Sequence, residues 1–186
     1  MIVETFKTPI LHLNLKNSFN FKKKIKEIKK KEGRIASNLG GYQSHDLEKN
    51  ASIFLPLLKI IEKEANYLAE QIGIRNNLKI NNFWINVNSY KNTNMPHSHP
   101  HSILSGSFYV KIPKDSGLIV FRHPISNLMD SYWINNIVNF TEFTSCTWRF
   151  TPNENDLLIF PSWLEHYVEP NMNKKEERIS IAFNLS

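Results

Sequence analysis

The sequence lacks the features that mark disulfide-stabilised and membrane-spanning proteins. It contains one cysteine, Cys146, which excludes an internal disulfide framework. It has no uninterrupted apolar stretch long enough to cross a bilayer, and the residues that follow Met1 do not form an apolar signal segment. We therefore expect a cytoplasmic protein with no membrane partner.

Internal repeats, low-complexity tracts and clear linkers are also absent. A chain of 186 residues that is 41% hydrophobic is long enough for one well-buried core and short for two domains. We predict a single domain over residues 1–186, with a helical front at 17–73 and a strand-rich core at 78–186.

The formal net charge of +6 comes largely from one stretch, "FKKKIKEIKKKEGR", at residues 21–34. Phe21, Ile25 and Ile28 recur there at helical spacing, which predicts a helix with one buried stripe and a lysine-rich solvated face. Because no aromatic residues are interleaved for base stacking, we do not expect a nucleic-acid partner.

Apolar spacing predicts the other elements of the front. Residues 1–15 alternate and contain β-branched residues, so they could form a leading strand. Asn17 or Ser18 is a suitable cap for the lysine-rich helix. A second helix is predicted over 46–73, where apolar residues recur at three- and four-residue steps: Leu55, Leu58, Ile61, Ala65, Leu68 and Ile72.

The apolar period changes to two after Leu78. Six short runs are rich in β-branched and aromatic residues and are bounded by Pro, Gly, Asn or Asp: "FWINVNSY", "ILSGSFYVKI", "GLIVF", "TSCTWRF", "DLLIF" and "ERISIAFNL". Many short strands in one segment indicate a barrel or a double-sheet jelly roll.

Three of these runs have one apolar face and one unusually polar face. Successive side chains of a strand point to opposite sides of a sheet, so Arg178, Ser180 and Asn184 share a face opposite Ile179, Ile181 and Phe183. Tyr109 lies on the polar face of "ILSGSFYVKI" in the same way. These polar faces either face water or line the mouth of a barrel, where an arginine would suit a carboxylate or phosphate ligand.

The stretch "MPHSHPH" places His97, His99 and His101 at alternate positions. Two histidines at i and i+2 on an extended segment project to the same side, as two neighbouring metal ligands must. The pair is His97 with His99 or His99 with His101, and His166 in "FPSWLEHYVEP" is the natural third ligand. A histidine-rich loop without metal stays open, because H-x-H alone is weakly specific.

Two long stretches resemble a known family. "MPHSHPHSILSGSFYVKIPKDSGLIVF" and "DLLIFPSWLEHYVEPNMNKKEERISIAFN" are similar to the 2-oxoglutarate- and Fe(II)-dependent oxygenases of phages and bacteria, relatives of the prolyl 4-hydroxylases, and "GGYQS" extends the likeness towards Asn38. The resemblance implies a mainly β fold, a double-stranded β-helix (jelly roll, cupin-like) preceded by two helices. Iron would lie at one open end, with 2-oxoglutarate inside.

The resemblance assigns the metal ligands. His97 matches the first ligand and His166 the distal histidine. The family usually has a carboxylate two residues after the first ligand, where this chain has His99. A neutral imidazole there raises the charge of the site by one and could favour another divalent metal, although three-histidine iron sites are chemically reasonable.

The resemblance also assigns the co-substrate site. Arg178 would bind the distal carboxylate of 2-oxoglutarate, Ser180 would complete an R-x-S pattern, and the Tyr109 hydroxyl would donate to the same carboxylate. Where relatives often have glycine before "DLLIF", this chain has Asn155, which can still adopt turn geometry.

The implied function is that of a dioxygenase that hydroxylates an unidentified substrate, with succinate and CO2 as co-products. One alternative is a cupin-like metal protein without oxygen chemistry, such as an isomerase, which would give Arg178 no role. The other is a non-catalytic binding module that has kept the fold and lost iron.

Two further features stay open at this stage. Residues 124–144, with Trp133, Phe140 and Phe143, form either a lid over the barrel mouth or a packed irregular loop. The sequence names neither the primary substrate nor the oligomeric state, so pairing of the chain with a copy of itself also stays open.

Overall fold

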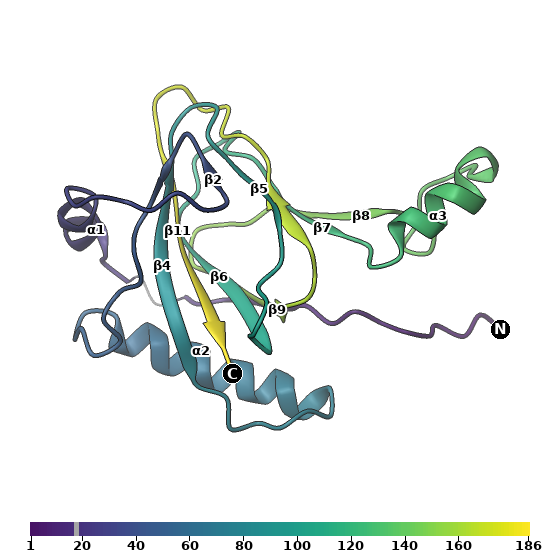
Figure 1. Ribbon diagram of the computed structural model, residues 1–186, viewed down its shortest axis with the longest axis horizontal. Coiled ribbons are helices and arrows are strands. Elements are labelled where there is room, and N and C mark those ends of the chain that lie inside the picture. Colours follow the sequence, from purple (N-terminus) through teal and green to yellow (C-terminus); the bar gives the residue numbers. More distant parts are fainter. Residues whose placement is uncertain (17–18) are drawn as a thin grey trace.

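Two antiparallel sheets form the body of the protein (Figure 1). The computed structural model describes residues 1–16 and 19–186. The first sheet has the strand order β1 (Leu11–Asn14), β9 (Asp156–Pro161), β6 (Leu104–Lys111), β11 (Arg178–Leu185), β4 (Ile80–Asn88) and β3 (Tyr42–Gln43). The second has the order β2 (Asn38–Leu39), β5 (Thr93–His97), β10 (His166–Val168), β7 (Ile119–Arg122) and β8 (Thr147–Phe150).

Side chains from both sheets line one cavity. Trp84, Tyr109 and Arg178 enter it from the first sheet, and His97 and His166 enter it from the second. The inner faces of the two sheets therefore oppose each other, as in a jelly roll. The expectation of a mainly β, jelly-roll-like fold is confirmed, whereas the winding of a double-stranded β-helix stays a prediction.

Two of the helices, α1 (Lys22–Ile28) and α2 (Leu55–Gln71), cover the outer face of the first sheet. They precede β4 in the chain, and both contribute side chains to the largest hydrophobic core. In Figure 1, α2 crosses below the strands of this sheet. α3 (Ser126–Trp133) and a short 3-10 helix, η1 (Ile134–Asn136), lie between β7 and β8.

The alternation predicted for the strands is what builds this core. Ile181, Phe183 and Leu185 of β11 are fully buried, with side chains of α2 on the same side of the sheet. Gly106 of β6 lies under the ring of Phe183, where an added Cβ would approach the ring and a neighbouring backbone oxygen to 2.3 Å. A larger residue at position 106 would force the strands apart.

The second helix begins nine residues later than predicted. It starts at Leu55 and not at Asp46, with Pro56 in its first turn. A proline inside a helix would clash with the carbonyl four residues earlier and could not donate its hydrogen bond, so a helix from Asp46 could not run through Pro56. The prediction was wrong at this end because the proline was not weighed.

Other parts of the front also differ from expectation. The leading strand covers only Leu11–Asn14, and the two-residue strands β2 and β3 lie in the helical front between its two predicted helices. The predicted cap residues, Asn17 and Ser18, lie outside the described residues, and the N-cap position of α1 is Phe21.

All six runs read as strands contain one, β4, β6, β7, β8, β9 and β11. β5 and β10 are not among these runs, because β5 contains a proline and no alternation of apolar residues, and β10 has only three residues. Asn155, just before β9, has φ of 69° and donates its N–H to the Tyr109 carbonyl, so the expected turn is present.

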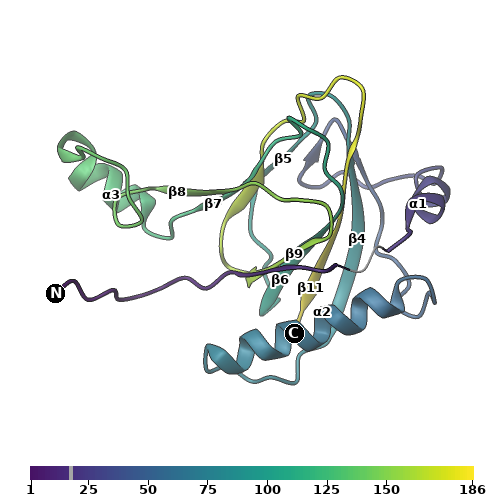
Figure 2. The ribbon, with the colours of Figure 1, turned by 180° about the vertical axis from the view of Figure 1, so that it is seen from behind.

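The segment from β7 to β8 projects from the barrel. This arm, residues 123–146, carries α3 and η1 and extends to the same side as the N-terminal residues (Figures 1 and 2). Across the described residues, 1–16 and 19–186, no helix has the length and apolar character needed to span a bilayer.

Burial of α2 yields a prediction for stability. Ile61 is fully buried against the sheet, so Ile61→Ala should lower the free energy of unfolding by about 2–5 kcal/mol through lost burial and a residual cavity. Tyr67 of the same helix is 52% exposed, and Tyr67→Ala should change it by less than about 0.5 kcal/mol. Urea unfolding of both variants measures the difference, and equal losses would contradict the packing described here.

Candidate metal centre and co-substrate pocket

Antiparallel pairing of β5 with β10 brings two histidines together. His97 is the register partner of His166, and directly paired residues point to the same face of a sheet. Their ring centroids lie 4.5 Å apart. The chain turns after β5, and the His99 N–H donates to the Ser162 carbonyl at 2.9 Å, which ties the loop to the segment before β10.

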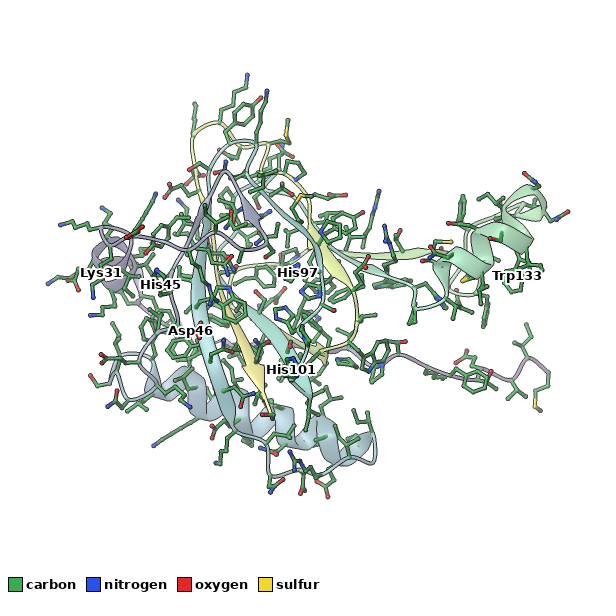
Figure 3. All side chains as sticks on the ribbon, in the orientation of Figure 1. Lys31, His45, Asp46, His97, His101 and Trp133 are labelled. Atoms are coloured by element: carbon green, nitrogen blue, oxygen red, sulfur yellow. The ribbon has the colours of Figure 1, made fainter. Side chains whose placement is uncertain are left out.

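These contacts produce a cluster of three imidazoles. One nitrogen from each of His97, His99 and His166 lies within 4.8 Å of the others. The Nε2 atoms of His99 and His166 are 3.3 Å apart. His101 is not part of the cluster: it is exposed and has φ of 68°. Figure 3 places His97 among the strands and His101 near the end of the barrel.

Backbone carbonyls orient two of the rings. His97 Nδ1 lies 2.7 Å from the Met95 carbonyl, and His166 Nδ1 lies 2.9 Å from the Leu164 carbonyl. A carbonyl only accepts, so each Nδ1 carries the proton and each Nε2 keeps a free lone pair. This is the arrangement that a metal-binding imidazole needs.

Burial keeps the cluster neutral. It lowers the pKa of His166 to about 3 and that of His99 to about 4, and in both cases the neighbouring His97 adds to the effect. The pKa of His97 is also lowered by burial, against opposing influences from the hydrogen bond to the Met95 carbonyl and from Glu165. Neutral imidazoles at neutral pH are free to bind a cation.

Arg178 projects into the same cavity from the first sheet. It is 2% exposed, and its Nη1 donates to the Glu169 carbonyl at 3.0 Å and to the Ser116 carbonyl. Its Nη2 is buried without a hydrogen-bond partner. Burial lowers the pKa of Arg178 to about 10, so the side chain keeps its charge at neutral pH.

An unpaired buried guanidinium nitrogen is costly and calls for an acceptor. Tyr109 and Ser180 line the cavity beside Arg178, and burial raises the pKa of the Tyr109 hydroxyl, which keeps it a donor. The cavity therefore offers donors at one end and metal-binding nitrogens at the other. This donor set suits a molecule with a carboxylate at one end and metal-binding oxygens at the other.

The sequence reasoning missed some of the cavity. Asn94 of β5 is buried and lines it, but β5 had not been recognised as a strand. Trp84 was assigned no role from the sequence, but its ring lies 5.7 Å from that of His99 and packs against it. The segment considered as a lid, residues 124–144, projects away from the barrel in Figures 1 and 2.

Fold and site together define a jelly-roll-like protein with a candidate mononuclear metal centre. The sequence model of the family described as "Putative 2OG-Fe(II) oxygenase" matches residues 82–184, and the chain belongs to this family. Fe(II) and 2-oxoglutarate are the cofactor and co-substrate that give the family its name. No curated protein sequence matches the chain.

Solved structures share the fold at low identity. The non-heme alpha-ketoglutarate-dependent epimerase SnoN from nogalamycin biosynthesis has a TM-score of 0.69 and 14% identity, over 96% of this chain and 76% of SnoN. HygX from Streptomyces hygroscopicus, solved with nickel and 2-oxoglutarate bound, has a TM-score of 0.64 and 12% identity, over 96% of this chain and 83% of HygX. The viral collagen prolyl hydroxylase vCPH from Paramecium Bursaria Chlorella virus-1, solved as a 2OG complex, has a TM-score of 0.60 and 12% identity, over 95% of this chain and 94% of vCPH.

The depressed pKa of His166 predicts how stability depends on pH. Below pH 6.5, the ordinary pKa of histidine, His166 is protonated in the unfolded chain and stays neutral in the folded chain. The free energy of unfolding therefore falls as the pH drops from 6.5 towards about 3. Between about pH 7 and about pH 5, the metal-free protein should lose about 2 kcal/mol of unfolding free energy through this residue. Urea unfolding at both pH values tests this, and an unchanged pH dependence in His166→Gln would contradict it.

Proposed function

We propose that this protein is an Fe(II)- and 2-oxoglutarate-dependent dioxygenase that hydroxylates an unidentified substrate, with succinate and CO2 as co-products. One observation carries the proposal: a cluster of three neutral imidazoles and a buried arginine with an unpaired Nη2 line the same cavity. Membership of the oxygenase family supports it. The similar solved structures include both an epimerase and a prolyl hydroxylase, so hydroxylation is the more specific part of the proposal.

The residues present fit an iron ion. His97, His99 and His166 would hold it through nitrogens that can approach one point, and imidazole is a suitable ligand for iron. When bound, iron and 2-oxoglutarate together supply the activation of dioxygen. With His99 in place of the usual carboxylate, the three protein ligands bring no negative charge.

The residues around Arg178 fit the distal carboxylate of 2-oxoglutarate. Arg178 Nη2 would donate to it, with the hydroxyls of Tyr109 and Ser180 as further donors. The free volume of the cavity is about 40 Å³, room for about three waters, so binding requires lining side chains to move aside. Ile119 and Phe160 form apolar walls of the same cavity, and the ring of Phe160 lies 4.7 Å from that of His166.

The buried arginine separates this proposal from the alternatives. A cupin-like metal protein without oxygen chemistry has no use for a guanidinium nitrogen left unpaired beside the metal cluster. A non-catalytic module that has lost iron has no use for three neutral, carbonyl-oriented imidazoles. Anaerobic addition of Fe(II) and 2-oxoglutarate, followed by the weak visible charge-transfer band, distinguishes the three.

Removal of the guanidinium should weaken co-substrate binding. Arg178→Ala should raise the dissociation constant for 2-oxoglutarate by at least about thirtyfold, because a buried carboxylate left unpaired costs about 2–5 kcal/mol. Calorimetric titration of the anaerobic Fe(II) protein measures it. Arg75→Ala removes an exposed arginine and should have no effect.

A conservative variant guards against misfolding of Arg178→Ala. Tyr109→Phe keeps the ring and removes one donor, so it should weaken 2-oxoglutarate binding by between about twofold and about tenfold. Unchanged affinity in both variants would refute the assigned co-substrate site.

Removal of one imidazole should weaken metal binding. His99→Ala should lower Fe(II) affinity on the order of 100-fold or more, since even outer partners of metal ligands are worth about 10–100-fold. His101→Ala changes a histidine two residues away that lies outside the cluster, and it should leave the affinity unchanged. Competition with a metal-sensitive dye gives the Fe(II) dissociation constant of each variant. Equal losses of affinity in the two variants would show that His99 and His101, and not His97 and His99, bind the metal together with His166.

A further inference from the structure

A second cavity of about 730 Å³ lies beside the metal centre and has no role in the proposed chemistry. One wall is the N-terminal segment, residues 2–10. The other is formed by the ends of β7 and β8 and the base of the arm. In Figures 1 and 2 the N-terminal segment and the arm leave the barrel towards the same side.

Strand register connects this cleft to the metal cluster. His97 pairs with His166, His166 with Phe121, and Phe121 with Trp148, in one row across β5, β10, β7 and β8. Directly paired residues share a face, so the Trp148 indole lies on the same inner face as the imidazoles. Two strand spacings, about 10 Å, separate the backbones of Trp148 and His166.

Only one layer of side chains divides the cleft from the cluster. Phe121 lines the cleft, and its ring lies 6.1 Å from that of His166. Leu164 also lines the cleft, and its carbonyl holds His166 Nδ1. The cleft is therefore continuous with the framework that positions a proposed metal ligand.

The cleft is aromatic and nearly free of unpaired charge. Its exposed aromatic residues come from both walls: Phe6, Trp133, Phe143 and Trp148. Lys7 pairs with Glu4, and Arg122 with Glu165 at 2.7 Å. The sequence from His123 to Trp148 has no lysine or arginine, which disfavours nucleic acid and anionic membranes as occupants.

Both walls also offer unpaired backbone. β8 is the last strand of its sheet and has a strand neighbour on one side, β7. In the described N-terminal range, 1–16, strand pairing begins at Leu11. Residues 2–8 of that range form no backbone–backbone hydrogen bond. An exposed strand edge pairs readily with another extended chain, and side-chain pockets beside it then select the sequence.

We infer that this cleft binds an extended segment of a polypeptide substrate, which pairs with the free edge of β8 and is anchored by an apolar side chain on Trp148. The inference rests on the proposed function, because it names the substrate class of that site. Trp148 then sets specificity, and the neutral, aromatic cleft selects uncharged residues next to the one that reacts.

Binding of fluorescein-labelled random-sequence peptides to the full chain tests the inference without turnover. Trp148→Ala should weaken binding about tenfold, as expected for loss of an aromatic anchor. Phe6→Ala, on the opposite wall and fully exposed, should weaken it in the same direction without risk to folding. Trp163→Ala is the matched control, because Trp163 is 57% exposed against 58% for Trp148 and does not line the cleft.

A second arm of the experiment tests strand pairing. The same peptides, N-methylated at alternate residues, lose their donors on one edge and should bind about tenfold more weakly to the unmodified protein. The inference would be overturned if N-methylation did not change the affinity for the peptides, or if Trp148→Ala and Trp163→Ala bound the peptides equally well. Tight binding of small apolar molecules with no binding of peptides would also overturn it. The same holds if sedimentation shows that the unmodified protein is a dimer and that Trp148→Ala is a monomer.

Failure of this inference is distinguishable from failure of the proposed function. The dissociation constant for 2-oxoglutarate in the Arg178 and Tyr109 variants reports on the proposed function and involves no peptide. Peptide binding that is sensitive to Trp148 in a protein that does not bind 2-oxoglutarate would support a peptide-binding cleft and refute the oxygenase.

Discussion

The antiparallel pairing of β5 with β10 is the contact on which the candidate site depends. It sets His97 opposite His166 and fixes the loop that presents His99 to the same point. Because a shift of one residue would turn every side chain of β5 to the other face, the register itself decides whether a cluster forms. The same row continues through Phe121 to Trp148, so one register relation organises both the metal centre and the neighbouring cleft.

The electrostatics of the site follow from the burial of basic side chains. The imidazoles respond by staying neutral, since burial lowers the pKa of His99 and His166. Arg178 cannot respond in this way and keeps its charge, with two carbonyls as acceptors and one nitrogen unsatisfied. The cavity is thus ready for a metal ion at one end and a carboxylate at the other, and the unsatisfied nitrogen is a cost that such a ligand would remove.

Particular elements explain where sequence reasoning succeeded. Alternation in β4, β6 and β11 was strong enough to place Arg178, Ser180 and Tyr109 on the polar faces of their strands, opposite the apolar faces that pack under the helices. The structure shows that these polar faces line the cavity. It failed at β2, β3 and β10, which are too short to show a period, and at β5, whose one buried residue is the polar Asn94. The start of α2 was misplaced because the prediction began at Asp46, ahead of Leu55, the first residue of the apolar spacing, and did not use the backbone restriction at Pro56.

By itself, the sequence determined the mainly β fold, the histidine-rich stretch that supplies two members of the cluster, and the polar strand face on which the arginine lies, because these follow from local alternation and residue chemistry. Only the tertiary structure decided which histidine pair joins His166, that His101 stays outside, and that Arg178 retains an unpaired nitrogen. It alone placed Trp148 in line with the cluster and the N-terminal segment across the cleft from it. These relations depend on pairing between strands far apart in the chain, which local patterns do not encode.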